Sequence, residues 1–133
     1  MAPADRVLVD TSVWVEFFRR PDSEHAMRLD ALVDVDACAL CGPVYAELIS
    51  GARNAEERDG LRELLAALPT LDAPEDVWDQ VGEVRYALAR KGRQASLVDV
   101  LIAVIAATNG VPLYTLDADF DAIAAEAGAE LIH

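Results

Sequence analysis

The fold of this chain follows from the stretch Val7-Leu8-Val9-Asp10-Thr11-Ser12-Val13-Trp14. Residues 6–9 lack the polar alternation of a half-exposed strand, which is typical of a short strand covered on both faces of a parallel sheet. Thr11 and Ser12 come directly after this strand and are typical helix N-caps, so we predict a helix that runs to about Arg19. A strand followed at once by a helix is the repeating unit of an α/β fold.

The same unit recurs along the chain. Short apolar runs predict further strands over residues 37–40, 112–115 and 130–132. Periodic apolar positions predict helices over residues 23–35, 42–51, 56–68, 75–89, 96–109 and 119–127, with a linker over 71–74. We therefore expect one domain over residues 1–133, a three-layer α/β/α fold with a short parallel sheet at its centre.

Composition narrows the class of protein. A chain of 133 residues with 53% hydrophobic side chains is typical of one folded domain. No apolar stretch reaches the length of a membrane span, and the first residues lack the pattern of a secretory signal, so we expect a cytoplasmic protein. The net charge of −13 disfavours general binding to nucleic acid and favours either a basic partner or a narrow basic patch on an acidic body.

Two cysteines form the motif Cys38-Ala39-Leu40-Cys41. A lone C-x-x-C motif allows a redox pair or half of a zinc site. A zinc site would need two more soft ligands, and only the distant His25 and His133 remain. The apolar neighbours favour a short buried strand in which each cysteine acts as a small hydrophobic side chain.

Four acidic residues interrupt apolar segments that are far apart in the sequence. Asp10 and Asp117 each follow a predicted strand, Glu47 lies in the helix after the second strand, and Asp99 lies in the first turn of the apolar helix over 96–109. Burying an unpaired carboxylate is costly, and the carboxyl ends of parallel strands share one edge of a sheet. The four acids are therefore expected to meet in one cleft, where a divalent cation would compensate them.

Such a cluster suits hard cations. Mg²⁺ and Mn²⁺ prefer carboxylate oxygens, and bound in this way they can activate water against a phosphodiester. Each acid also has a structural alternative. Asp99 can complete a variant of the capping box with Ser96, Asp10 and Asp117 can cap helices, and Glu47 can pair with Arg53.

The ordered set of motifs resembles the PIN domain, and within it the bacterial VapC toxins of type II toxin–antitoxin systems. The residues that carry this resemblance are Val7 to Trp14, Glu47, Asp99 in its apolar helix, and the stretch Leu113-Tyr114-Thr115-Leu116-Asp117-Ala118-Asp119-Phe120. The resemblance covers almost the whole chain. It implies a Mg²⁺- or Mn²⁺-dependent endoribonuclease with a PIN-like fold.

The resemblance also implies roles for single residues. Asp10 and Asp99 would bind the metal, Asp117 would bind a second ion or act through water, and Glu47 would hold a metal or orient the attacking water. Ser12 and Thr115 match hydroxyl positions that support the acids, and Asp119 is either a supporting acid or a helix cap.

The family further implies a homodimer and a VapB-like antitoxin whose C-terminal segment blocks the cleft. The clustered basic residues are either solvated helix ends or part of an RNA path. Our hypothesis is that the RNA path is lined by Arg19, Arg20, Arg85, Arg90, Lys91 and Arg93.

Other classes of α/β protein fit less well. A receiver-type signalling domain needs paired acids after its first strand and a lysine after a late strand, whereas Asp10 is single and Lys91 precedes the Asp99 helix. A haloacid-dehalogenase-like phosphatase needs a second aspartate where Ser12 stands. A non-catalytic module that keeps the fold for binding antitoxin or RNA stays open.

Overall fold

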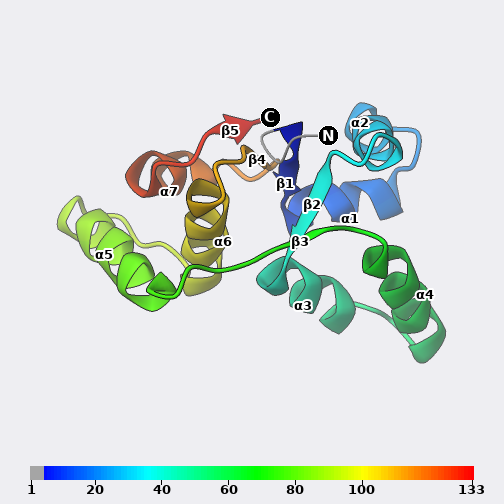
Figure 1. Ribbon diagram of the computed structural model, residues 1–133, viewed down its shortest axis with the longest axis horizontal. Coiled ribbons are helices and arrows are strands. Elements are labelled where there is room, and N and C mark those ends of the chain that lie inside the picture. The colour runs from blue at the N-terminus through cyan, green and yellow to red at the C-terminus, as the bar shows by residue number, and fades with distance from the viewer. Residues whose placement is uncertain (1–4) are drawn as a thin grey trace.

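A computed structural model of the protein describes residues 5–133. Its centre is a sheet of five parallel strands in the order β3-β2-β1-β4-β5 (Figure 1). The strands are β1 (Val7–Val9), β2 (Cys38–Cys41), β3 (Thr70–Leu71), β4 (Leu113–Tyr114) and β5 (Leu131–Ile132). The helices are α1 (Thr11–Arg19), α2 (Glu24–Asp34), α3 (Gly42–Ser50), α4 (Ala55–Ala66), α5 (Val77–Arg90), α6 (Leu97–Thr108) and α7 (Phe120–Ala127).

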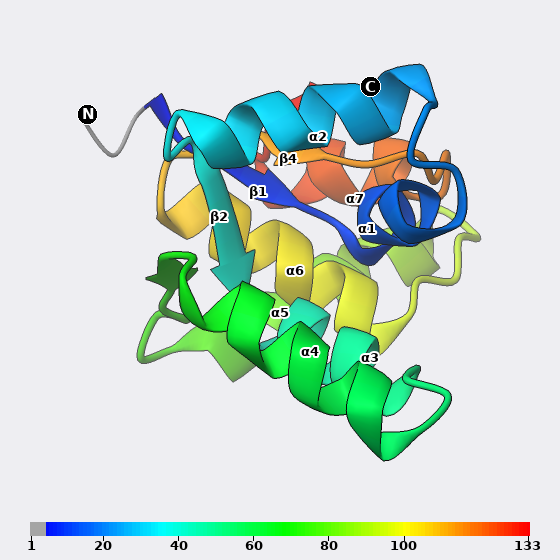
Figure 2. The same ribbon diagram turned by 90° about the vertical axis from the view of Figure 1, so that its right-hand side faces the viewer.

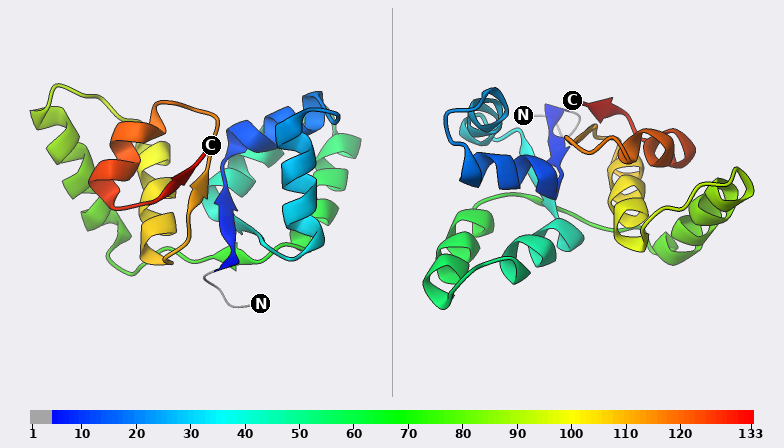
Figure 3. Two further views of the ribbon diagram at one scale, coloured as in Figure 1. Left: turned by 90° about the horizontal axis from the view of Figure 1, so that it is seen from above. Right: turned by 180° about the vertical axis from the view of Figure 1, so that it is seen from behind.

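The helices form two layers around the sheet. Helices α1 to α4 lie on one side of β1 and helices α5 to α7 on the other, as two views of the ribbon agree (Figures 1 and 3). The chain adds β2 and β3 toward one edge of the sheet, and then passes back beyond β1 to add β4 and β5 toward the opposite edge. Because parallel crossovers are right-handed, this reversal of direction puts the later helices on the opposite face of the sheet. The predicted three-layer α/β/α fold with a central parallel sheet is confirmed.

The core lies between the sheet and the helix layers. Leu8 and Val9 of β1 are fully buried, and so are most side chains of α6 between Val100 and Ala106. Figure 2 shows α6 running behind β1 and β2. Burial of each large aliphatic side chain stabilises the fold by roughly 1.5–3 kcal/mol, so this apolar helix is the main support of the second layer.

Most predicted segments are observed within one or two residues of their expected bounds, and three details differ. The predicted linker over 71–74 begins inside β3, whose two residues pair with Leu40 and Cys41. Helix α5 begins at Val77 and not at residue 75. The N-cap of α1 is Asp10, whose side chain accepts a hydrogen bond from the Ser12 backbone, and not Thr11 or Ser12.

These differences have local physical causes. A strand of two residues carries no periodicity, and its existence depends on pairing with β2. Residues 75 and 76 form a turn in which the Val77 backbone N–H donates to the Pro74 carbonyl at 3.1 Å, so the helix itself begins at Val77. Within residues 5–133, no helix is long and apolar enough to cross a membrane.

Candidate functional site

Asp10 lies at the carboxyl end of β1, where the sheet edge meets the start of α1. Its side chain is 5% exposed. One carboxylate oxygen, Oδ2, accepts hydrogen bonds from Ser12 Oγ at 2.8 Å, Thr115 Oγ1 at 3.0 Å and the Ser12 backbone N–H at 3.3 Å. The other oxygen, Oδ1, accepts none from residues 5–133 and is not sealed from solvent. The protein thus holds Asp10 by one oxygen and leaves the other available to a ligand.

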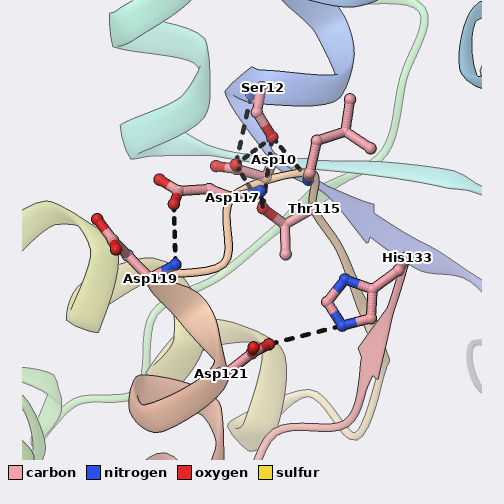
Figure 4. A network of polar contacts seen from close by, with 8 residues as sticks. Asp10, Ser12, Thr115, Asp117, Asp119, Asp121 and His133 are labelled. Atoms are coloured by element: carbon pink, nitrogen blue, oxygen red, sulfur yellow. Dashed lines mark hydrogen bonds and ion pairs between the residues drawn. The ribbon is translucent and has the colours of Figure 1, made fainter.

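Two hydroxyl groups connect Asp10 to the loop after β4 (Figure 4). Ser12 Oγ accepts the backbone N–H of Leu116 at 3.0 Å, and Thr115 Oγ1 accepts that of Asp117 at 3.0 Å. Each hydroxyl carries one proton, and each donates it to Asp10 Oδ2. The contact of 3.3 Å between Ser12 and Thr115 is therefore a packing contact within this network. The network fixes the loop that carries Asp117 against the start of α1.

Asp117 lies within this loop and is half-buried. Its Oδ1 accepts the backbone N–H of Asp119 at 2.9 Å, so Asp117 stabilises the turn that leads into α7. Asp119 is the N-terminal flanking residue of α7, but its own side chain makes no capping hydrogen bond. The Asp119 carboxylate is exposed and lines a neighbouring hollow with Arg93 and Gln94. Asp117, and not Asp119, does the capping.

Asp99 approaches the same region from the first turn of α6. Ser96 Oγ accepts the Asp99 backbone N–H at 3.0 Å, which caps the helix as predicted. The hydrogen bonds of residues 5–133 include none from the Ser96 backbone N–H to Asp99, so the reciprocal half of a capping box is missing there. The carboxylate of Asp99 is thereby not used in capping its own helix.

The carboxylate of Asp99 is influenced by the charges of the other three acids. Burial raises the pKa of Asp99, and the negative charges of Asp10, Asp117 and Glu47 raise it further, against a lowering by the Ser96 side chain. None of these four carboxylates forms an ion pair with a basic side chain of residues 5–133. The site therefore concentrates negative charge that the described part of the chain does not neutralise.

Glu47 stands at the outer side of the site, on α3. Its Oε1 accepts a hydrogen bond from Thr11 Oγ1 at 2.8 Å. The alternative partner Arg53 is engaged elsewhere, with Glu57 at 3.1 Å. Thr11 and Glu47 both line a hollow of about 450 Å³ between α1, α3 and α4, which also contains Arg19. Thr11 is a residue that the sequence analysis missed in this role, and its hydroxyl directly after Asp10 was the available signal.

The donor chemistry of this cluster fits Mg²⁺ or Mn²⁺, because every ligand atom on offer is a carboxylate or hydroxyl oxygen. In the part of the chain that the structure describes, no three His, Cys, Asp or Glu side chains are already drawn together into a preformed metal site. Four unpaired carboxylates repel one another, and two of them are turned toward local donors, Glu47 toward Thr11 and Asp117 toward Asp119. A bound cation would offset the repulsion between them.

The two cysteines lie in the strand β2. Both are free and buried. Burial raises the pKa of Cys38 to about 12 and that of Cys41 to about 11, the latter with a contribution from the charges of Asp10 and Glu47. A thiol with such a pKa carries almost no thiolate at neutral pH, so the interpretation as small hydrophobic side chains holds.

The basic residues predicted to bind RNA fall into two places. Arg19 lies at the hollow that contains Glu47, and Arg20 pairs with Glu16 at 3.3 Å. The other four lie around the end of α5: Arg85, Arg90, Lys91 and Arg93. The structure thus does not gather all six residues into one surface.

Comparison with known proteins places this chain in a family. The profile of the PIN domain matches residues 7–126. Ribonuclease VapC11 of Mycobacterium tuberculosis is 34% identical over 122 residues, which cover 89% of this chain and 91% of that protein. Ribonuclease VapC5 of Mycobacterium tuberculosis is 32% identical over 136 residues, covering 98% and 96%.

Solved structures agree on the fold. A chain of VapBC2 from Rickettsia felis, crystallised with a DNA fragment from its promoter, superposes with a TM-score of 0.76 at 23% identity and covers 95% of this chain and 96% of that one. VapBC-5 from Mycobacterium tuberculosis, a member of the VapBC family of toxin–antitoxin systems, gives a TM-score of 0.69 at 28% identity, covering 97% and 98%.

Proposed function

The chain belongs to the PIN domain family, with VapC ribonucleases among its relatives, and we propose that it is a metal-dependent endoribonuclease. In this proposal residues 1–133 form a single PIN domain that acts in the cytoplasm as the toxin of a VapBC-type toxin–antitoxin pair. It hydrolyses RNA phosphodiester bonds with a metal-activated water.

One observation carries the proposal. Burial raises the pKa of Asp99, the charges of Asp10, Asp117 and Glu47 from three other segments raise it further, and no basic side chain of residues 5–133 pairs with any of the four acids. A helix cap requires one carboxylate beside backbone N–H groups, so capping explains single acids and not their convergence. A site for a hard divalent cation explains the whole set.

The residues have distinct roles in this mechanism. Asp10 Oδ1, Asp99, Asp117 and Glu47 would hold Mg²⁺ or Mn²⁺, with Asp10 and Asp99 as the principal ligands. The bound cation would lower the pKa of a coordinated water and stabilise charge on the phosphate and the leaving oxygen.

The remaining residues orient these ligands. Ser12 and Thr115 fix the Asp10 carboxylate, so that its free oxygen faces the site without rotation. Thr11 keeps the Glu47 carboxylate within reach of a water on the open side of the cluster. Asp119 supports the site indirectly, because its backbone orients Asp117.

The partners follow from charge. The four acids weaken RNA binding when no cation is bound, so the RNA affinity must come from basic side chains near the site. The candidates are Arg19, Arg20, Arg85, Arg90, Lys91 and Arg93. The acidic cluster also suits a basic segment, which is what a VapB-like antitoxin would insert to block the site. Separately, we propose a homodimer as the assembled toxin.

A cleavage experiment tests the function. Purified protein, stripped of any antitoxin, is incubated with total cellular RNA with and without Mg²⁺ or Mn²⁺. Wild-type protein should cut RNA only with metal, Asp10→Asn should not, and Asp30→Asn, an exposed acid on α2, should cut like the wild type. Absence of both cutting and metal binding in the wild type would leave the four acids a structural role only and favour the non-catalytic module.

A further inference from the structure

A basic surface adjoins the acidic site at the end of α5. Residues 84–98 contain four basic and no acidic side chains, in a chain with 24 acidic and 11 basic residues overall. This segment covers the last turns of α5, the loop to α6 and the first residues of α6. It is thus the one long acid-free basic stretch that leads directly into the helix of Asp99.

The basic side chains of this segment are not equivalent. Lys91 pairs with Glu126 at 2.8 Å, and Arg85 donates from Nε to the carbonyl of Ala95 at 3.1 Å. Arg90 lies over the ring of Tyr86, with its guanidinium carbon 4.6 Å from the ring centre. Arg93 forms no side-chain hydrogen bond or ion pair with residues 5–133, and its side chain is exposed. Arg93 is therefore the charge of this surface that remains available to a ligand.

The backbone that carries Arg93 is fixed. The Arg93 backbone N–H donates to Leu88 at 2.9 Å, and Gly92 donates to Ala89 at 3.0 Å. The bond from Arg85 to Ala95 holds the other side of the same loop. A charged side chain on a held backbone loses less entropy on binding than one on a mobile loop.

Two hollows meet at Arg93. One, of about 870 Å³, is lined by Arg93 with Tyr86, Gln94 and Ser96. The other, of about 610 Å³, joins Arg93 and Gln94 to Asp119 at the start of α7. Ser96 caps the helix of Asp99, and Asp119 hydrogen-bonds to Asp117, so both hollows border segments that carry site acids. Helices α5, α6 and α7 lie side by side in this part of the molecule (Figure 1).

We propose that Tyr86, Arg93 and Gln94 form a subsite for a nucleotide next to the phosphodiester that is cut. The inference rests on the proposed ribonuclease function. Arg93 binds a backbone phosphate, because a guanidinium pairs with phosphate through two parallel hydrogen bonds. The ring of Tyr86, which is 59% exposed, offers a surface on which a base can stack, and the Gln94 amide can donate to and accept from a base edge.

RNA binding tests this subsite without reference to cleavage. A labelled single-stranded RNA of mixed sequence is titrated with the full chain in EDTA, by fluorescence anisotropy, over a series of salt concentrations. Arg93→Ala should weaken binding roughly tenfold and reduce the slope of log affinity against log salt by about 0.7, the value for one lost phosphate contact on a single strand. Arg62→Ala, which removes an exposed arginine from α4, should change neither quantity.

The tyrosine provides a second comparison. Tyr86→Ala should weaken binding by roughly fivefold or more, whereas Tyr86→Phe, which keeps the ring, should bind like the wild type. Circular dichroism and light scattering on each variant check the fold and the oligomeric state. If a variant changes the oligomeric state but not RNA affinity, the surface is an interface between copies of this chain and the proposal is wrong.

Two further results would also overturn the proposed subsite. One is equal RNA affinity of the wild type, Arg93→Ala and Arg62→Ala, and the other is no binding of the RNA by the wild type. The failure of the subsite and the failure of the function are separable. Metal-dependent cutting with unchanged RNA affinity in Arg93→Ala refutes only the subsite. Loss of affinity in Arg93→Ala without any metal-dependent cutting by the wild type refutes only the nuclease.

Discussion

Replacing Asp10 in two ways separates its structural from its chemical role. In Asp10→Ala the N-cap of α1 is lost, which costs about 1 kcal/mol. The hydroxyls of Ser12 and Thr115 also lose a charged acceptor in a buried position, at about 1.5 kcal/mol for each bond. Together these losses lower the free energy of unfolding by about 4 kcal/mol, a large part of the 5–15 kcal/mol typical of a domain.

Asp10→Asn should behave differently. The amide oxygen can keep the three hydrogen bonds made by Oδ2, although a neutral acceptor is about half as strong, and one charge leaves a repulsive cluster. We expect a stability loss of only about 1–2 kcal/mol. The amide NH₂ then occupies the position of Oδ1, and it cannot bind a cation, so cleavage should fall at least about 100-fold.

Thermal unfolding of the metal-free proteins, followed by circular dichroism, measures the difference. Asp10→Ala should unfold roughly 12 °C or more below the wild type, and Asp10→Asn within roughly 6 °C of it. Thr115→Val, which keeps the shape but removes both the donor to Asp10 and the acceptor of the Asp117 backbone N–H, should fall between them. Equal Tm values for the Ala and Asn variants would refute the reasoning, because the hydroxyl network would then contribute nothing to holding the loop.

Two further predictions concern the titration of buried groups. The raised pKa of Asp99 means that the folded protein keeps this proton to higher pH than the unfolded chain does, so the metal-free protein loses stability as pH rises from the ordinary value of 3.8 through the raised pKa. Asp99→Asn should lose less stability over this pH range and be at least as stable as the wild type at pH 7 without metal, whereas Mg²⁺ should raise the Tm of the wild type only. Urea unfolding at several pH values, with and without Mg²⁺, measures both effects. A steeper loss of stability with pH in the variant would contradict the raised pKa of Asp99. Burial raises the pKa of Cys38 to about 12 and that of Cys41 to about 11, so neither thiol should react with a disulfide reagent at pH 8 in the folded protein. Both thiols should react in denaturant. Rapid reaction of native Cys41 would show that β2 opens readily.

Local sequence patterns were sufficient for much of the fold. The strand over 6–9 and the helix after it were predictable because an unbroken apolar run and a polar cap are both encoded within ten residues. The same holds for α6, whose Ser96 cap and apolar length are plain in the sequence. Strand β3 was not predictable, because two residues carry no pattern and the strand exists only through its pairing with β2.

The placement of the acids was predictable in part. Residues after strands in a parallel sheet lie at one edge, so the meeting of Asp10 and Asp117 follows from topology. The partners of each side chain did not follow. Glu47 turns to Thr11 and not to Arg53, and Lys91 pairs with Glu126, which is 35 residues away. Such choices depend on side chains from segments that only folding brings together.

The sequence by itself determined every element except β3, which residues stand at the sheet edge, and that the edge would be acidic, because these properties depend on apolar periodicity and on position after a strand. The tertiary structure alone decided that Oδ2 of Asp10 is held by Ser12 and Thr115 while Oδ1 is left open. It also decided that Arg93, among the basic residues around α5, is left without a partner in residues 5–133. Hydrogen bonds depend on distance and direction between groups as far apart as 105 residues in the chain, and no local pattern records them.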